Sequence, residues 1–352
     1  MTIDLQSLVR TNIKNLVKYS TARDEYPGKI GIFLDANENA FGSPVEGNFN
    51  RYPDPHQSAL KSGISKIKGI AEKYIFTGNG SDEAIDILIR IFCNPGAESI
   101  IICPPTYGMY EVAAGINDVQ VKRVLLLPET FSLDVKGILS AITPDVKIIF
   151  LCSPNNPTGN SMGREDIKKI LTGFNGIVVV DEAYINYSSQ QSLISLLTEY
   201  PNLIILQTMS KAWGLASLRI GMAFASAEII ELMDKVKGPY NISGIAQQLA
   251  LESLDKLQLV NQRIRSTVSE RNKLIAELSG LSGIKKIYPS DANFILIRVE
   301  NANALFDYLL SKQIIVRNRS KVVLCDDCLR ITIGTPQENL ELIQSVKGFY
   351  QL

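Results

Sequence analysis

The sequence contains one histidine and five cysteines, and these small numbers exclude several kinds of site. His56 is the only histidine among 352 residues, so a metal site built from several imidazoles is excluded. Any Ser–His or Cys–His nucleophile would have to use this one residue, for which an exposed loop position is the favoured interpretation. Cys325 and Cys328 form a lone C-x-x-C pair that no second pair or nearby histidine completes as a zinc site. A redox pair is the alternative, but we interpret them as structural cysteines of a strand or turn.

The sequence also lacks an excess of either charge and any long apolar run. Its 36 Lys and Arg balance 36 Asp and Glu, whereas nucleic acids and anionic membranes require a broad positive surface. The most apolar segments, 146–154 and 176–184, are far shorter than the about 20 residues of a membrane-spanning helix. The first ten residues include Asp4 and Arg10 and no secretory apolar core. We therefore expect a soluble, cytoplasmic protein that binds neither nucleic acid nor membrane.

The middle of the chain alternates short Val- and Ile-rich runs with longer amphipathic segments. The runs predict strands, and they cover residues 99–105, 146–154, 176–184, 202–210 and 219–226. Between them, 81–92 and 163–174 have apolar residues at helical spacing, and Ser81 followed by acidic residues is typical of a helix start. This alternation predicts β-α-β units around a buried, mostly parallel sheet flanked by helices.

The C-terminal third has a different pattern, which predicts a smaller α+β domain. We expect one long amphipathic helix over 244–280, followed by strands at 293–299, 313–319 and 328–334 and helices at 303–312 and 337–350. With about 150 residues as a typical domain, the length allows two domains. The predicted division is an N-terminal arm (1–45) that contributes to the small domain and the active site, a large domain (46–245) and a small domain (246–352).

Three of the predicted strands end in polar residues: Asn155–Asn156, Asp181–Glu182 and Ser210–Lys211. In an open parallel sheet, ligands bind at the carboxyl ends of the strands, so these ends should converge on one crevice. A lysine there can have a lowered pKa and react with an aldehyde cofactor, although Lys211 alone also fits a surface lysine. Asp181 could pair with a pyridinium nitrogen or simply cap a turn. Together, the two residues favour a pyridoxal-phosphate site.

A glycine-rich turn, Gly78-Asn79-Gly80-Ser81-Asp82, precedes the helix predicted at 81–92. Free N–H groups and the positive end of the helix dipole could bind a phosphate there. An ordinary turn with a helix cap fits the same residues. The segment lacks the third glycine of a dinucleotide fingerprint, and no P-loop lysine follows it.

Longer motifs along almost the whole chain resemble those of fold-type I pyridoxal-phosphate aminotransferases (class I/II). The segments SPNNPTG (153–159), VVVDEAYINY (178–187) and TMSKAWGLASLRIG (208–221) are general to that family. The combination of LDANEN (34–39), RYPDP (51–55), PPTYGMY (104–110) and LRITIGT (329–335) resembles its histidinol-phosphate branch. Two positions depart from the pattern, Ala40 and Ser217, and neither removes a reactive group.

The resemblance implies a site for pyridoxal 5′-phosphate. Lys211 would bind it as a Schiff base and then move the proton of the substrate carbon, while Asp181 would pair with the ring nitrogen. Tyr184 and Asn156 would hydrogen-bond the ring hydroxyl oxygen, and Tyr107 would stack on the ring. The phosphate ligands would be Ser81, Asp82, Ser210 and Arg219, together with Tyr52 from the neighbouring subunit of a homodimer.

The resemblance also implies the substrates, histidinol phosphate and 2-oxoglutarate or glutamate. Arg330 matches the family's carboxylate-binding arginine, and its planar fork suits a carboxylate or a phosphate equally well. Either Arg317 or Arg319 would be a second anion contact, at even odds with a solvated strand arginine. Further substrate contacts are expected from Tyr19, Arg23, Asn37 and Tyr240.

The expected activity is ping-pong transamination of L-histidinol phosphate, in histidine biosynthesis. The alternative is a related enzyme of the same cofactor that acts on aromatic amino acids or threonine phosphate. A third hypothesis is a non-catalytic, cofactor-binding regulator. It is disfavoured because the full set of polar residues is present and no basic segment is added.

Overall fold

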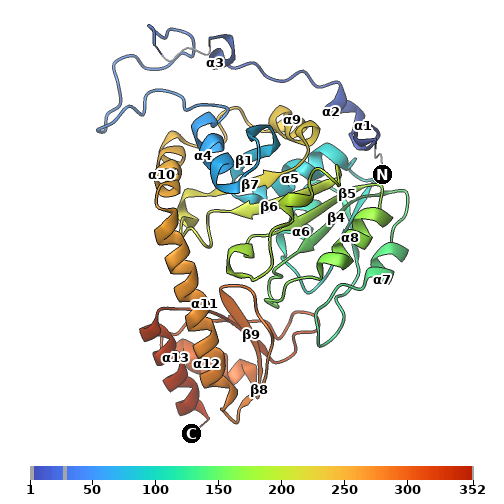
Figure 1. Ribbon diagram of the computed structural model, residues 1–352, viewed down its shortest axis with the longest axis vertical. Coiled ribbons are helices and arrows are strands. Elements are labelled where there is room, and N and C mark those ends of the chain that lie inside the picture. The colour runs from blue at the N-terminus through green and yellow to red at the C-terminus, as the bar shows by residue number, and fades with distance from the viewer. Residues whose placement is uncertain (1–3, 27–29, 351–352) are drawn as a thin grey trace.

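The computed structural model describes residues 4–26 and 30–350. Within these residues, seven strands form a large sheet and four form a small one (Figure 1). The large sheet has the order β1 (Ile75–Asn79), β7 (Ile220–Phe224), β6 (Leu203–Thr208), β5 (Ile177–Asp181), β4 (Val146–Cys152), β2 (Ser99–Ile102) and β3 (Gln120–Arg123). Only β7 runs antiparallel to its neighbours. The predicted mostly parallel sheet is therefore confirmed.

The large sheet is buried on both faces, as its continuous apolar strands require. Along β4, Ile149 and Leu151 pack into one core, whereas Ile148 and Phe150 pack into the other. Helices supply the opposite wall of each core: α4 (Ser58–Lys68), α5 (Ser81–Phe92), α6 (Met109–Ile116), α7 (Val135–Ser140), α8 (Arg164–Gly173), α9 (Ala227–Val236) and α10 (Gly244–Leu254). This double layer holds the carboxyl ends of the strands rigidly at one edge.

The small sheet has the order β10 (Arg317–Asn318), β11 (Cys328–Thr332), β9 (Phe294–Val299) and β8 (Ile284–Ile287), and all its pairs are antiparallel. It packs against α11 (Leu257–Ser279), α12 (Ala302–Ser311) and α13 (Pro336–Phe349). The long helix α11 runs from the body of the large sheet down to the small one (Figure 1). The predicted smaller α+β unit is present.

Several predicted element bounds were wrong. The single helix expected over 244–280 is two helices, because the chain breaks at Asp255 and Lys256 between α10 and α11. The strand expected over 313–319 pairs only at Arg317 and Asn318. The helix predicted at 81–92, by contrast, is confirmed as α5, which begins at Ser81 and has Gly80 as its cap. Because the helical spacing of apolar residues continues across the break between α10 and α11, periodicity alone could not locate that break.

Other elements were not predicted: the strands β1, β3 and β8, the helices α4, α6, α7 and α9, the short helices of the N-terminal arm, and the short helices η1 (Glu72–Tyr74), η2 (Ile185–Tyr187), η3 (Leu193–Leu196) and η4 (Ala216–Leu218). The strands β3 and β8 are short and partly exposed, so they lack the apolar run that marks a buried strand.

The N-terminal arm has two parts. The first contains α1 (Leu5–Leu8) and α2 (Thr11–Lys14), and its Leu5, Val9 and Ile13 pack on the large-sheet core. The second part, which includes α3 (Ala22–Glu25), extends over the top of the molecule (Figure 1). The division at residues 45 and 245 stays a prediction. In the ranges that the structure describes, no helix is long and apolar enough to cross a membrane.

Candidate active site

A cavity of about 740 Å³ lies at the carboxyl ends of the large-sheet strands. Ile102 ends β2, Cys152 ends β4 and Asp181 ends β5, and all three line it. Twelve of the predicted site residues also line it, and they are Ser81, Asp82, Tyr107, Asn156, Asp181, Tyr184, Ser210, Lys211, Arg219, Arg317, Arg319 and Arg330. The crevice predicted from the polar strand ends is therefore present, and the small sheet adds its arginines to the wall.

Asp181 lies at the floor of this cavity and is 3 % exposed. Its Oδ2 accepts a hydrogen bond from the Tyr110 hydroxyl at 2.8 Å, and its Oδ1 accepts one from the Ala183 N–H at 3.0 Å. Burial raises the pKa of the carboxyl to about 6, although these hydrogen bonds and the charge of Lys211 act in the opposite direction. Both hydrogen-bond donors are neutral, so the carboxylate can still accept a buried cation.

The N-terminus of α5 forms one end of the cavity. Its cap, Gly80, has φ +76° and no side chain to cover the first N–H groups of the helix. A Cβ at Gly80 would lie 2.5 Å from Nη2 of Arg219, so glycine is needed for this close approach. Arg219 in turn lies 3.3 Å from Oδ2 of Asp82 and 3.5 Å from Oγ of Ser210. Free N–H groups, a guanidinium and a hydroxyl thus converge, as an anion site requires.

Lys211 follows β6 by three residues, and its side chain is exposed to the cavity. The surrounding protein lowers its pKa by desolvation, and the positive charges of Arg330 and Arg219 act in the same direction. Asp181 opposes this shift. Nζ lies 5.6 Å from the centre of the Tyr184 ring. The amine is therefore favoured in its neutral, nucleophilic form more than a surface lysine would be.

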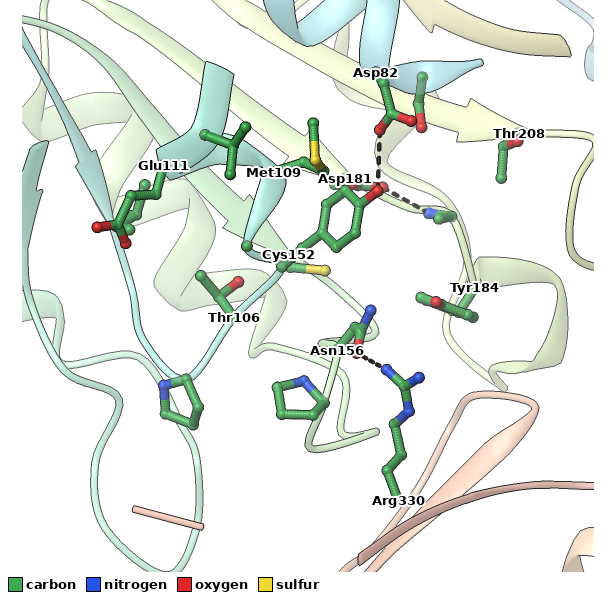
Figure 2. Close-up of a pocket in the computed structure, with 18 of the residues that line it drawn as sticks. Asp82, Thr106, Met109, Glu111, Cys152, Asn156, Asp181, Tyr184, Thr208 and Arg330 are labelled. Atoms are coloured by element: carbon green, nitrogen blue, oxygen red, sulfur yellow. Dashed lines mark hydrogen bonds between the residues drawn. The ribbon is translucent and has the colours of Figure 1, made fainter. Parts of the chain in front are cut away.

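The opposite wall of the cavity carries three arginines of the small sheet. Arg330 lies on β11 and donates a hydrogen bond to Oδ1 of Asn156, toward which it points in Figure 2. Its register partner across the sheet is Arg317 on β10, and Arg319 follows immediately. Desolvation lowers the pKa of Arg330, and the charge of Arg317 adds to that effect. Positive charges so close together favour an anionic ligand.

The predicted contacts from residues 19–52 and from residue 240 lie outside this cavity. Tyr52 stacks on Tyr240 at 4.5 Å, and together with Asn37 they line a separate cavity. Tyr19 lines a small hollow beside His56. Arg23 pairs with Asp35 and Glu38 in the arm itself. Within one chain, the structure does not bring these five predicted residues (Tyr19, Arg23, Asn37, Tyr52 and Tyr240) to Lys211.

Sequence reasoning assigned no role to Tyr110, whose hydroxyl binds the floor carboxylate. Tyr110 is fully buried, stacks on Phe150 at 4.9 Å and meets the Tyr107 ring edge-on at 5.6 Å. The Tyr107 hydroxyl donates to Oδ1 of Asp82 at 3.1 Å. The spacing of the two tyrosines places both beside the site, but nothing in the sequence distinguishes a buried tyrosine with this partner from an ordinary core residue.

Of the C-x-x-C cysteines, Cys325 lies just before β11 and Cys328 begins it, and neither lines the cavity. Both are free and fully buried. Burial raises the pKa of the Cys325 thiol to about 12 and that of Cys328 to about 11, which disfavours the reactive thiolate. The structural interpretation is thus favoured. No group of three or more potential metal ligands (His, Cys, Asp or Glu) occurs in the part of the chain that the structure describes.

Comparison with known proteins identifies the family to which this chain belongs. Residues 35–346 match the model of the family described as aminotransferase class I and II. The chain belongs to this family. A histidinol-phosphate aminotransferase from Cytophaga hutchinsonii is 51 % identical to it, over 99 % of this chain and 100 % of that protein. The resemblance inferred from the motifs is confirmed.

Solved structures agree with this class I and II aminotransferase fold. The histidinol-phosphate aminotransferase from Clostridium acetobutylicum superposes with a TM-score of 0.80 at 27 % identity, covering 86 % of this chain and 92 % of that one. The enzyme from Sinorhizobium meliloti in complex with pyridoxal-5′-phosphate gives a TM-score of 0.79 at 22 % identity over 97 % of each chain. This chain is therefore a transaminase of the fold-type I architecture, and its cofactor is pyridoxal 5′-phosphate.

Proposed function

We propose that this transaminase transfers the amino group of L-histidinol phosphate to 2-oxoglutarate and yields imidazole-acetol phosphate and L-glutamate. The main observation behind this proposal is that three arginines, Arg317, Arg319 and Arg330, line the same cavity as Lys211. A second anion site, at Arg219, lies at the α5 end of the same cavity. Two separate anion sites fit a phosphorylated cofactor and an anionic substrate bound at the same time. The name of the 51 % identical relative supports the choice of substrate.

The residues of the cavity fit pyridoxal phosphate. The buried Asp181, whose hydrogen-bond donors are both neutral, offers a partner for the ring nitrogen. The uncapped helix end at Gly80, with Ser81, Ser210 and Arg219, offers the phosphate cradle. The aromatic face of Tyr107, held by its bond to Asp82, offers the surface on which the ring would stack.

When bound, pyridoxal phosphate supplies a protonated ring that accepts electrons from the substrate carbon. Asp181 would keep the proton on the ring nitrogen, because a buried carboxylate stabilises a cation beside it. Lys211, with its lowered pKa, would hold the cofactor through its amine and, once freed by the substrate amine, would take the proton from the substrate carbon and return it to the cofactor side. The Tyr184 hydroxyl and the amide N–H of Asn156 would donate to the ring oxygen.

The substrate anion binds to Arg330 in this proposal. Asn156 orients Arg330 by accepting its hydrogen bond, and Arg317 or Arg319 adds a second guanidinium. Histidinol phosphate has a phosphate but no carboxylate, whereas glutamate has two carboxylates. A guanidinium binds either anion through two parallel hydrogen bonds. One site can therefore serve both halves of the ping-pong reaction.

A second copy of the chain completes the site in our proposal. The stack of the exposed Tyr52 on the half-buried Tyr240, together with Asn37, lies apart from Lys211 in the same chain and is therefore available to a neighbouring cavity. Tyr52 would reach the cofactor phosphate there, and Tyr19 and Arg23 would come with the same arm. A homodimer with two-fold symmetry gives each cavity one such contribution. We place this dimer in the cytoplasm, where its five free cysteines would stay reduced.

The deciding experiment compares amino donors by steady-state kinetics of the purified enzyme, with 2-oxoglutarate as the acceptor. Histidinol phosphate should have the highest kcat/KM among itself, phosphothreonine, phenylalanine and tyrosine. A higher value for an aromatic amino acid, or release of carbon dioxide from phosphothreonine, would replace the proposed substrate and keep the cofactor chemistry.

A matched variant tests the shared anion site. Arg330→Ala should lower kcat/KM for histidinol phosphate and for glutamate by similar factors, on the order of 100-fold, because both anions lose the same charged bidentate partner. Factors that differ by more than about tenfold, which is about 1.4 kcal/mol, would contradict a single site for both substrates.

A further inference from the structure

Arg271 is a buried arginine that lies behind the active site on α11. Its side chain is 7 % exposed. Nη1 donates to the carbonyl oxygen of Ala292 at 2.8 Å and contacts that of Tyr187 at 3.4 Å, while the buried Nε has no hydrogen-bond partner. The guanidinium thus joins two backbone segments that are far apart in the sequence.

Stability alone does not explain an arginine at this position. Desolvation lowers its pKa, and only the negative charge of Asp291 acts against that shift. The atoms that accept its hydrogen bonds are neutral carbonyl oxygens. A buried cation with such partners is costly, and an apolar side chain of similar volume often stabilises a core as well or better. What an apolar residue cannot do is bind carbonyls of two segments with one rigid fork.

The two segments support two parts of the cavity wall, one that carries Tyr184 and one that carries Arg330. Tyr187 ends η2, which directly follows Tyr184, and Ala292 lies two residues before Phe294 on β9. The Phe294 ring meets the Tyr184 ring edge-on at 5.1 Å, and the Arg330 guanidinium lies 5.2 Å from its centre. Phe294 therefore touches both walls, and Arg271 fixes the backbone on either side of it.

The loop that Arg271 binds, residues 290–293, has two more contacts with the site. The N–H of Asp291 donates to the carbonyl oxygen of Gly159 at 2.7 Å, in the segment that carries Asn156. The carbonyl oxygen of Asn293 accepts from the N–H of Ile333 at 2.9 Å, just beyond the strand that carries Arg330. The hydrogen bond between Arg330 and Asn156 thus spans two elements that this one loop holds together.

We infer that Arg271 is a positioning residue that fixes the Tyr184 and Arg330 walls at the separation that the substrate anion requires. Figure 2 shows Tyr184 and Arg330 near one another beside Asn156, with Arg330 directed at Asn156. The inference deepens the proposed function and rests on it, since it concerns the anion site assigned to Arg330. Small displacements matter here, because a shift of about 1 Å can cost about 100-fold in rate.

The test compares Arg271→Met and Arg271→Lys with Arg265→Met, which removes an exposed arginine from the same helix. Binding of succinate, a dicarboxylate without a keto group, is titrated against each cofactor-loaded enzyme by calorimetry. In Arg271→Met, the Kd for succinate and the KM for the keto-acid substrate should both rise about tenfold, with a smaller change in kcat. Arg271→Lys keeps the charge but not the fork, so it should give an intermediate rise, and Arg265→Met should give none.

Thermal unfolding of the same variants separates positioning from packing. A purely structural Arg271 would lower the melting temperature and leave the succinate Kd and the KM unchanged, and that result would overturn the inference. If Arg271→Met does not fold, the decision rests on Arg271→Lys, for which a wild-type Kd would equally overturn it. The titration needs no turnover. Failure of the wild-type enzyme to use histidinol phosphate would therefore contradict the proposed substrate without altering this readout.

Discussion

The Lys211 cavity and the N-terminal arm contrast sharply in how they hold their functional candidates. In the cavity, Asp181 is 3 % and Tyr184 7 % exposed, on elements with apolar cores behind them. In the arm, Ile32 is 91 % and Phe41 101 % exposed. A parallel sheet can assemble polar strand ends within one chain, whereas apolar side chains this exposed require a surface that the same chain does not provide. Substitutions in the Lys211 cavity and in the N-terminal arm can therefore test this contrast.

The largest effect is expected from Lys211→Ala, within the cavity. Loss of the amine removes both the covalent attachment of the cofactor and the proton transfer, and each such group is worth up to about 10⁴-fold in rate. Turnover of histidinol phosphate should become undetectable. Borohydride should fix labelled pyridoxal phosphate to the wild-type protein and not to the variant. Fixation of the label at the same level in Lys211→Ala would remove Lys211 from its proposed role.

A subunit-mixing experiment tests the arm directly. As pure dimers, Lys211→Ala should be inactive and Tyr52→Ala only weakly active. In a mixed dimer, the subunit with an intact Lys211 receives the intact Tyr52 of its neighbour, so activity should return in up to half of the sites if Tyr52 acts across the interface. Mixing after mild dissociation, followed by an assay, measures this recovery. No recovery in a proven mixed dimer would place Tyr52 outside the neighbouring cavity.

The buried Asp181 should make the stability of the cofactor-free protein depend on pH. Its pKa is about 6 in the folded chain and about 3.9 in an unfolded one, so the folded state binds more protons between these values. Protonation of Asp181 therefore contributes about 3 kcal/mol to the free energy of unfolding. This contribution is complete below about pH 4 and is lost as the pH rises through about 6.

Denaturant unfolding of the wild type and Asp181→Asn between pH 4 and 8 measures this contribution as the difference between the two curves. The variant should become the more stable protein as the pH rises. Parallel curves would show that the carboxyl is not protonated in the empty cavity. In the loaded enzyme, the same variant should lose turnover while retaining much of its cofactor, since shape is kept and the ring-nitrogen partner is lost.

The smallest effect is expected from an ion pair within the arm. Arg23 pairs with Asp35 at 2.6 Å, and both side chains remain partly open to water. Such pairs contribute about 0–1 kcal/mol, so Asp35→Asn should change the unfolding free energy by less than about 1 kcal/mol. Chemical denaturation checks this value. A larger loss would show that the arm is held firmly by its own chain, which would weaken the contrast with the cavity.

Much of the large sheet and most of the cavity could be predicted from the sequence. Strand-sized apolar runs marked β2, β4, β5, β6 and β7, and the motif residues from Ser81 to Arg330 met in one place. The strands β3 and β8 could not be predicted, because they are short and partly exposed. The break between α10 and α11 was missed because the helical pattern continues across Asp255 and Lys256. Tyr110 was missed because its role depends on the partner that its hydroxyl meets.

The sequence by itself determined the chemistry of this protein: a lysine, an aspartate and a set of arginines at strand ends, with too few histidines for a multi-imidazole metal site. The functional group of a side chain does not depend on its position in the fold, so motifs and composition could identify these residues. Only the tertiary structure decided which of them share a cavity. It separated Tyr52 and Tyr240 from Lys211, and it placed the buried Arg271 between two walls. Distances between segments far apart in the chain depend on packing, which no local pattern of residues records.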